Sequence, residues 1–123
     1  MAERTHRILL VEDDESIRES VRHVLQERGY EVITARDGVE GLMRVERDAP
    51  DLLILDMIMP RRSGLTVLER LHRSPLRRPK IIMMSAIEDP RQREFAMSRG
   101  VDRFILKPFD LDELAAEVES LLE

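Results

Sequence analysis

The 123-residue sequence predicts an α/β protein with helices on both faces of a parallel sheet. Short apolar runs rich in branched residues alternate five times with longer amphipathic stretches, a pattern typical of repeated β-α units. Two of the runs, residues 7–11 (RILLV) and 51–56 (DLLILD), are apolar at consecutive positions. Strands tolerate this only where helices cover both faces of the sheet. We therefore expect a three-layer, doubly wound parallel sheet with right-handed crossovers.

The expected elements follow one another without a linker, a repeat or a low-complexity segment. The expected strands are the apolar runs 7–11, 31–35, 51–56, 80–86 and 103–107. The expected helices are the amphipathic stretches 16–28, 38–47, 65–71, 91–99 and 111–122. Each helix thus lies between two strands or follows the last one, as a series of right-handed β-α crossovers requires.

The residues at the element boundaries agree with this assignment. Gly29 and Gly100 stand where helices are expected to end, a position at which glycine is favoured. Segments 16–19 (SIRE) and 110–113 (DLDE) have the pattern of N-terminal capping boxes. We therefore expect Ser16 and Asp110 to cap the helices that follow them.

Length and composition indicate one globular domain over residues 1–123, since 42% of the residues are hydrophobic and 37% are charged. The net charge of -5 gives no support for nucleic-acid binding and favours a basic protein surface as partner. The absence of cysteine excludes disulfides and thiol chemistry. No apolar run reaches the roughly 18 residues of a membrane span, and the N-terminus lacks the apolar region of a signal peptide. A cytoplasmic protein that does not enter the membrane is the expectation.

Polar or charged residues stand at the carboxyl ends of four of the five expected strands. Glu12 and Asp13 follow the first strand, Asp56 ends the third, Ser85 closes the fourth and Lys107 ends the fifth. Ligands of open parallel sheets bind beyond these ends, so we expect the five residues to share one site. Neighbouring carboxylates repel one another, and a hard divalent cation such as Mg²⁺ relieves the repulsion. A cation, a lysine and a hydroxyl suit phosphoryl transfer to a carboxylate, with Asp56 as the nucleophile.

Some residues of this set have plainer interpretations. Acids favour helix N-termini, so we assign Asp14 and Glu15 to the start of the following helix rather than to the cation site. Ser85 has an alternative as a turn residue at a strand end, and Lys107 has one as a surface lysine.

Four segments, taken together, resemble the receiver domain of bacterial two-component response regulators. They are ILLVEDD (8–14), LLILDMIMPRRSG (52–64), MMSA (83–86) and FILKPF (104–109). In the second segment, Asp56, Pro60 and Gly64 have the D-x3-P-x3-G spacing of that family. The motifs occur in the family's order, and the resemblance covers the whole chain.

The resemblance implies a flavodoxin-like strand order, 2-1-3-4-5, and a role for each matching residue. Asp56 would accept a phosphoryl group from a phosphohistidine, giving an acyl phosphate. Asp13, Asp56 and the backbone carbonyl of Ile58 would bind Mg²⁺ or Mn²⁺, and Glu12 would hold the ion through water.

The resemblance also implies a switch. Lys107 would contact the phosphoryl group or the Asp56 carboxylate, and Ser85 would move to bond a phosphoryl oxygen. The ring of Phe104 would fill the space that Ser85 leaves, which changes the surface of the fourth helix, fifth strand and fifth helix. The bond between Lys107 and Pro108 is expected to be cis, so that the lysine points inward.

Two positions set the expected lifetime of the acyl phosphate. Ile58 and Ile87 stand two residues beyond Asp56 and two beyond Ser85. In this family these positions flank the path of the hydrolytic water and are often polar in members that lose the phosphoryl group quickly. We therefore hypothesise that the acyl phosphate of this chain is shielded and long-lived.

A receiver domain would take its phosphoryl group from a sensor histidine kinase or a phosphotransfer protein and would act on an output domain or a downstream protein. Its chemistry is stoichiometric, so we do not expect an enzyme. Both a stand-alone regulator and one part of a longer protein fit the sequence. A flavodoxin-like electron carrier is the alternative, but it needs a glycine- and hydroxyl-rich loop after the first strand and aromatic rings to stack on its cofactor. Here that loop is acidic, and the chain has one Tyr, three Phe and no Trp.

Overall fold

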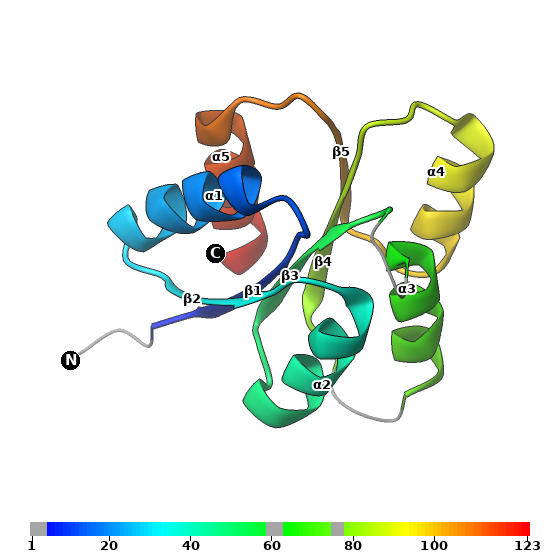
Figure 1. Cartoon of the computed structure of the whole chain (residues 1–123), viewed down its shortest axis with the longest axis horizontal. Coiled ribbons are helices and arrows are strands. Elements are labelled where there is room, and N and C mark those ends of the chain that lie inside the picture. Colours follow the sequence, from blue (N-terminus) through cyan, green and yellow to red (C-terminus); the bar gives the residue numbers. More distant parts are fainter. Residues whose placement is uncertain (1–4, 59–62, 75–77) are drawn as a thin grey trace.

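The structure is a computed structural model that describes residues 5–58, 63–74 and 78–123. Five strands form one sheet, with helices on both of its faces (Figure 1). The elements are β1 (Arg7–Val11), α1 (Glu15–Glu27), β2 (Glu31–Ala35), α2 (Gly38–Asp48), β3 (Leu52–Asp56), α3 (Gly64–Arg73), β4 (Lys80–Ser85), α4 (Pro90–Ser98), β5 (Arg103–Leu106) and α5 (Leu111–Leu122). All ten expected elements are present, with bounds that differ from the prediction by at most two residues.

The strand order is β2-β1-β3-β4-β5, and every pair of neighbours is parallel. This confirms the order that the resemblance implied. The chain passes from β1 to one side for β2 and to the other side for β3, so β1 and β3 flank the point where the order reverses. Val11 of β1 lies beside Leu55 of β3, and the residues that follow both strands therefore emerge together at the ligand-binding edge.

Alternate strand residues enter two separate cores because successive side chains of a strand point to opposite faces. The core under α2, α3 and α4 takes from the strands Leu9, Val11, Ala35, Leu53, Leu55, Ile81 and Met83. The core under α1 and α5 takes Ile8, Leu10, Leu52, Ile54, Ile82 and Met84. All five residues of β3 are buried, which confirms that its continuous apolar run reflects cover on both faces.

The capping residues agree with the prediction at one helix and correct it at another. Asp110 caps α5, and its side chain accepts hydrogen bonds from the backbone N–H groups of Asp112 and Glu113 at 2.8 and 3.2 Å. The expected cap of the first helix, Ser16, is wrong. Asp14 is extended and accepts from the N–H of Ile17 at 2.9 Å. It is therefore the N-cap of α1, which confirms that Asp14 and Glu15 belong to the start of this helix.

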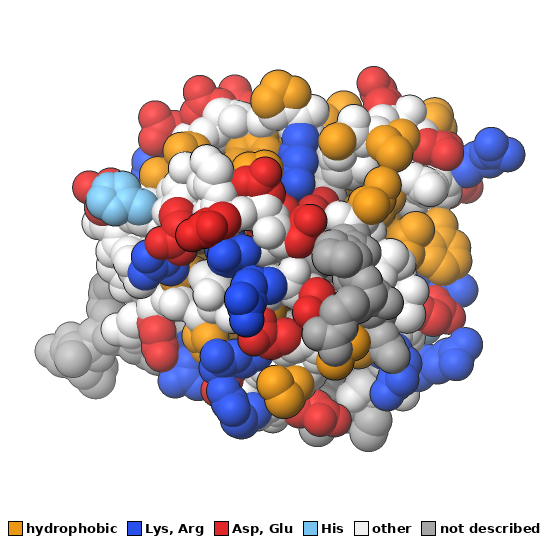
Figure 2. Space-filling view, viewed as in Figure 1, with side chains coloured by type: hydrophobic (Ala, Val, Ile, Leu, Met, Phe, Trp, Pro, Cys, Tyr) orange, Lys and Arg blue, Asp and Glu red, His pale blue; other side chains and the backbone are white. Residues whose placement is uncertain are grey.

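Acidic and basic side chains are interspersed over the face seen in Figure 2, where no single sign of charge dominates. This mixture fits the modest net charge of -5 and offers no continuous basic surface on that face for a nucleic-acid backbone. In the part of the chain that the structure describes, no helix has both the length and the apolar character that a membrane span requires.

Candidate functional site

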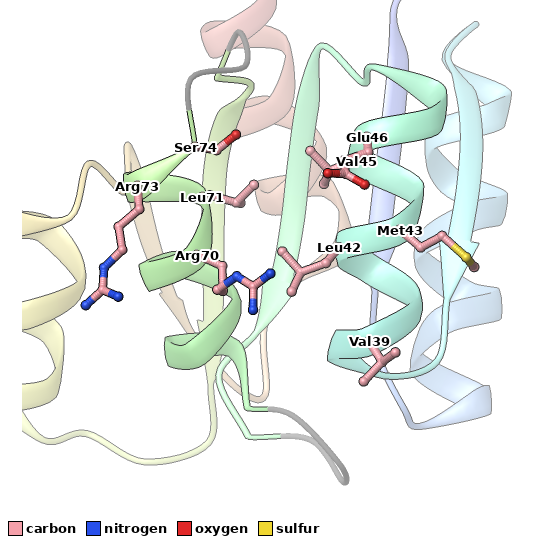
Figure 3. Close-up of a pocket in the computed structure, with 9 residues that line it drawn as sticks. All are labelled: Val39, Leu42, Met43, Val45, Glu46, Arg70, Leu71, Arg73 and Ser74. Atoms are coloured by element: carbon pink, nitrogen blue, oxygen red, sulfur yellow. The ribbon is translucent and has the colours of Figure 1, made fainter.

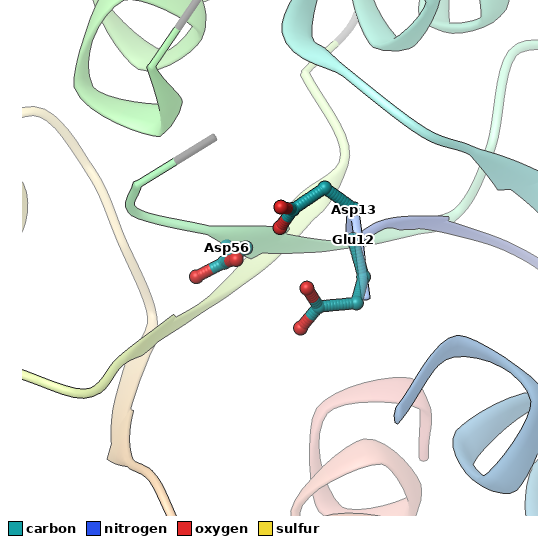
Figure 4. A group of neighbouring side chains, drawn as sticks. All are labelled: Glu12, Asp13 and Asp56. Carbon is teal, nitrogen blue, oxygen red and sulfur yellow. The ribbon is translucent and has the colours of Figure 1, made fainter. Parts of the chain in front are cut away.

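Three carboxylates converge at the ends of β1 and β3 (Figure 4). Glu12, Asp13 and Asp56 each offer an oxygen atom, and these atoms all lie within 4.8 Å of one another. Glu12 is completely buried and Asp56 is 4% exposed, whereas Asp13 is exposed to solvent. The parallel pairing of β1 with β3 therefore brings together residues more than forty positions apart in the sequence.

Lys107 completes the cluster from the end of β5. Its Nζ atom lies 2.7 Å from Oε1 of Glu12 and 3.2 Å from Oδ2 of Asp56. The bond between Lys107 and Pro108 is cis, as the resemblance implied, and the lysine side chain points into the site. The backbone N–H of Lys107 donates to the carbonyl oxygen of Ser85 at 2.7 Å, which joins the ends of β4 and β5.

The site carries uncompensated negative charge. Burial, followed by the charge of Glu12, raises the pKa of Asp56 to about 7, although Lys107 acts in the opposite direction. Burial by itself would lower the pKa of Lys107, but the hydrogen bond to Glu12 and the charge of Asp56 outweigh it, and the pKa is raised. Near neutral pH, the Asp56 side chain is therefore protonated for much of the time. A cation that displaces this proton would leave Asp56 as a carboxylate.

The three carboxylates differ in how open they are to a metal ion. Oε1 of Glu12 accepts from Lys107 at 2.7 Å, and Oε2 accepts from the backbone N–H of Asp14 at 3.0 Å. Glu12 thus has both oxygens engaged, whereas Asp13 is open to solvent. An all-oxygen cluster of carboxylates at close range suits a hard divalent cation, so the residues present fit a metal ion of this kind.

Ser85 is buried at the end of β4, one residue beyond Met84, which pairs with Asp56. Its hydroxyl group donates to the carbonyl oxygen of Ile87 and accepts from the N–H of the same residue, both at 3.0 Å. In this structure Ser85 is therefore engaged within the loop that precedes α4. Ile87 itself is 47% exposed.

Phe104 lies on β5 beside Met83 and is half-buried against the core under α2, α3 and α4. The guanidinium carbon of Arg93, on α4, lies 5.7 Å from the centre of its ring. A small hollow of about 140 Å³ adjoins the ring and is lined by Glu88, Asp89, Pro90, Arg93, Phe104 and Leu106. The aromatic side chain thus lies between the sheet and α4.

The loop after β3 is described only in part. Ile58 is 54% exposed, and Pro60 of the D-x3-P-x3-G pattern lies outside the described residues. Gly64 begins α3, and its backbone N–H donates to the carbonyl oxygen of Met57 at 2.7 Å. The N-terminus of α3 is therefore held directly against the end of β3, beside Asp56.

Two residues near the carboxylates have contacts that the sequence did not reveal. Asp14 bonds to Glu12 through its backbone N–H, besides capping α1. Arg18 of α1 donates from Nη1 to the carbonyl oxygens of Glu12 and Asp13. Because both contacts involve backbone atoms, no pattern of side-chain types would have revealed them.

A larger groove, of about 530 Å³, lies between α2 and α3 and contains none of these residues (Figure 3). Leu42 and Val45 of α2 face Arg70 and Leu71 of α3 across it. Its lining combines apolar side chains with Glu46, Arg70 and Arg73 and holds a single carboxylate. We therefore assign the chemistry to the carboxylates at the strand ends instead.

The carboxylates and the lysine lie where the strand order of this doubly wound sheet reverses. Nucleotide and flavin carriers have a phosphate-binding loop at this place. Carboxylates and a lysine there instead are typical of a signalling domain that accepts a phosphoryl group. Comparison with known proteins agrees. The chain belongs to the response regulator receiver domain family, whose model matches residues 8–119. Family membership decides against the electron-carrier alternative.

Relatives and solved structures support the same assignment. Over 116 residues the chain is 43% identical to response regulator MprA of Mycobacterium leprae and 41% identical to that of Mycobacterium avium. These matches cover 94% of this chain and 50% of each relative, so the chain spans about half the length of the curated relatives it matches. A CheY-like receiver domain protein from Methanospirillum hungatei superposes with a TM-score of 0.89 at 32% identity, covering 96% of this chain and 94% of that one. The receiver domain of Francisella response regulator 1452 gives a TM-score of 0.89 at 26% identity, covering 95% and 96%.

Proposed function

We propose that Asp56 is the phospho-acceptor of this receiver domain and that a phosphohistidine is the donor. One observation carries the proposal: Asp56 is the carboxylate that lies 3.2 Å from Lys107 and keeps a small exposed fraction, 4%, at the strand edge, whereas Glu12 has none. Glu12 is enclosed with both oxygens bonded, and Asp13 has no contact with the lysine among those the structure describes. A nucleophile needs a free oxygen and a nearby positive charge.

The transfer needs no further reactant. An oxygen of Asp56 attacks the phosphorus atom, and the new O–P bond forms as the P–N bond to the donor imidazole breaks. The imidazole nitrogen leaves with the electron pair of that bond, and the product is an acyl phosphate. Lys107 neutralises charge on the transferred group from its position beside Asp56.

The residues that would hold Mg²⁺, or Mn²⁺ in its place, are Asp13, Asp56 and the backbone carbonyl of Ile58, with Glu12 acting through water. When bound, the ion supplies positive charge to the oxygens of the transferring group. The arrangement of Glu12 supports the indirect role, because each of its oxygens already accepts a hydrogen bond, one from Lys107 and one from the N–H of Asp14.

The same proposal includes the output. Ser85 would exchange its two bonds with Ile87 for a bond to a phosphoryl oxygen. Phe104 would then turn into the space that Ser85 leaves, and the surface formed by α4, β5 and α5 would change. Each chain accepts one phosphoryl group and loses it slowly, so the domain acts as a switch rather than an enzyme.

We assign the donor to a sensor histidine kinase or a phosphotransfer protein, and the receiver of the signal to an output domain or a downstream protein. A groove of about 370 Å³ beside Lys107 supports a protein donor, because its largely apolar lining gives a partner surface to bury. The groove is lined by Ser16, Ile17, Ser20, Val21, Ala86, Lys107, Pro108, Phe109 and Leu111. A cytoplasmic location, where ATP-dependent kinases act, belongs to this proposal.

The first test is labelling with a small phosphodonor. Incubation with acetyl phosphate and Mg²⁺ should add the mass of one phosphoryl group per chain, and hydroxylamine, which cleaves acyl phosphates, should remove it. EDTA and Asp56→Asn should each abolish the labelling. Asp112→Asn, which changes an exposed acid of α5 that pairs with Arg28, is the matched control and should be labelled normally. Labelling of Asp56→Asn to the wild-type level would refute the assignment.

A second test concerns the lifetime of the acyl phosphate. Ile58 and Ile87 are both exposed beside the site, at 54% and 47%, and neither can orient a water molecule. We expect Ile87→Glu to accelerate loss of the phosphoryl group at least about tenfold, since a positioned acid–base group contributes that much or more. Met97→Glu places the same acid at an exposed position of α4 and should leave the rate unchanged. Wild-type decay within seconds, with no acceleration in Ile87→Glu, would disprove the shielding hypothesis.

A further inference from the structure

Arg18 of α1 contacts the backbone of the turn that carries Glu12 and Asp13, two of the candidate metal-binding residues. Nη1 of Arg18 donates to the carbonyl oxygen of Glu12 at 3.0 Å and lies 3.5 Å from that of Asp13. Arg18 is half-buried on α1, one helical turn beyond the N-cap residue Asp14. Its guanidinium group therefore lies against the backbone carbonyl groups of Glu12 and Asp13, the two residues whose side chains face Asp56.

The choice of partner is unusual for an arginine in such an acidic segment. Residues 12–15 offer four carboxylates, and the guanidinium group pairs strongly with carboxylates. Among the described acids, however, none lies within ion-pair distance of Arg18, and its guanidinium group contacts two carbonyl oxygens instead. The carboxylates of Glu12 and Asp13 consequently stay directed at Asp56, as Figure 4 shows.

We infer that Arg18 is a positioning residue for the cation site. It fixes the orientation of the Glu12 and Asp13 peptides, and with them the directions in which their side chains leave the backbone. Groups that orient the ligands of a metal, without touching the metal, typically change its affinity by about 10- to 100-fold when they are removed. The inference rests on the cation binding proposed above and adds a residue that the family resemblance did not supply.

A second effect of Arg18 has the opposite sign. Its positive charge lies near the carboxylates and repels a divalent cation, so removal of the charge alone would tighten binding. Loss of orientation would weaken binding instead. The direction of the change in Mg²⁺ affinity therefore shows whether Arg18 acts by orienting the ligands or only through its charge.

The experiment compares three variants of the full chain by isothermal titration with MgCl₂. Arg18→Gln removes both the charge and the guanidinium donor, and we expect the dissociation constant for Mg²⁺ to rise about tenfold. Arg18→Lys keeps the charge and replaces the planar guanidinium group by a compact ammonium group, so it should recover part of the affinity. Arg22→Gln is the matched control, one turn further along α1, where Arg22 bonds to Glu19 rather than to the turn; its dissociation constant should equal that of the wild type.

Thermal unfolding of the metal-free variants separates positioning from general stability. We expect Arg18→Gln and Arg22→Gln to shift the unfolding midpoint by similar small amounts, while only Arg18→Gln changes the dissociation constant. An unchanged or lower dissociation constant in Arg18→Gln overturns the inference and leaves the proposed metal site intact. Failure of the wild type to bind Mg²⁺ would overturn both.

Discussion

Replacing Asp56 by asparagine is expected to stabilise the metal-free protein by about 1–3 kcal/mol at pH 8, although it destroys the proposed acceptor. The wild-type carboxylate is 4% exposed and belongs to a cluster whose oxygens lie within 4.8 Å of one another. An amide of nearly the same shape removes the buried negative charge and keeps the packing. Urea unfolding in the presence of EDTA measures the difference.

The same substitution should remove a pH dependence. In the folded chain the pKa of Asp56 is raised from 3.8 to about 7, so the folded state holds its proton at pH values where the unfolded state has lost it. The contribution of the Asp56 proton to the free energy of unfolding is fully present below about pH 4 and is lost as the pH rises toward about 7. Between pH 5.5 and pH 8 the wild type should therefore lose about 1–2 kcal/mol relative to Asp56→Asn.

Metal provides the control for this prediction. Saturating Mg²⁺ should stabilise the wild type, since a ligand that binds only the folded state raises the free energy of unfolding. It should have little effect on Asp56→Asn, which lacks one of the carboxylates. A variant that is less stable than the wild type at pH 8 without metal would contradict the view that these carboxylates repel one another in the folded state.

Replacing Gly64 by alanine should destabilise the domain by about 2–3 kcal/mol and weaken Mg²⁺ binding as well. A Cβ atom on Gly64 would lie 2.2 Å from the carbonyl oxygen of Asp56 and 2.8 Å from Cα of Met57. Both are backbone atoms at the end of β3, so α3 or the strand end must move. Because the displaced peptide is that of Asp56, the effect should reach the carboxylate. Urea unfolding and titration with MgCl₂ measure the two consequences.

Gly41→Ala is the matched control, since Gly41 is also a buried glycine within a helix. Its added Cβ would lie 3.0 Å from a methyl carbon of Val11, a side-chain atom that can yield. Alanine also favours the helix, so the net change should stay within about 1 kcal/mol. Equal stability losses in the two variants, with Mg²⁺ affinity intact in Gly64→Ala, would contradict the prediction. They would show that the contact between an added Cβ atom and the Asp56 carbonyl group neither destabilises the domain further nor moves the carboxylate.

The fold could be predicted from local patterns because the parallel sheet is covered on both faces. The run at 51–56 became a strand with every residue buried from Leu52 to Asp56, as a central strand of a three-layer domain requires. The start of the first helix could not be predicted as well. Ser16 and Asp14 both suit an N-cap, and the choice depends on where the turn after β1 ends, which local sequence does not determine.

The candidate site was predictable to the extent that it consists of side chains at strand ends. Glu12, Asp13, Asp56 and Lys107 lie together because parallel strands end at one edge, which is a property of the fold class. The contacts of Arg18 and Gly64 are of another kind. Both involve carbonyl oxygens or backbone carbons of nearby segments of the same chain, whose positions depend on the final packing of α1 and α3.

The alternation of side chains along the strands has one more consequence. Glu12 and Asp56 continue the rows that begin with Ile8 and Leu52, on the α1 and α5 side of the sheet. Phe104 belongs to the opposite side, under α4. A donor docked beside α1 therefore leaves the aromatic ring and α4 uncovered. Modification would therefore take place on the α1 and α5 side of the sheet, whereas the aromatic ring that responds to it lies on the α4 side.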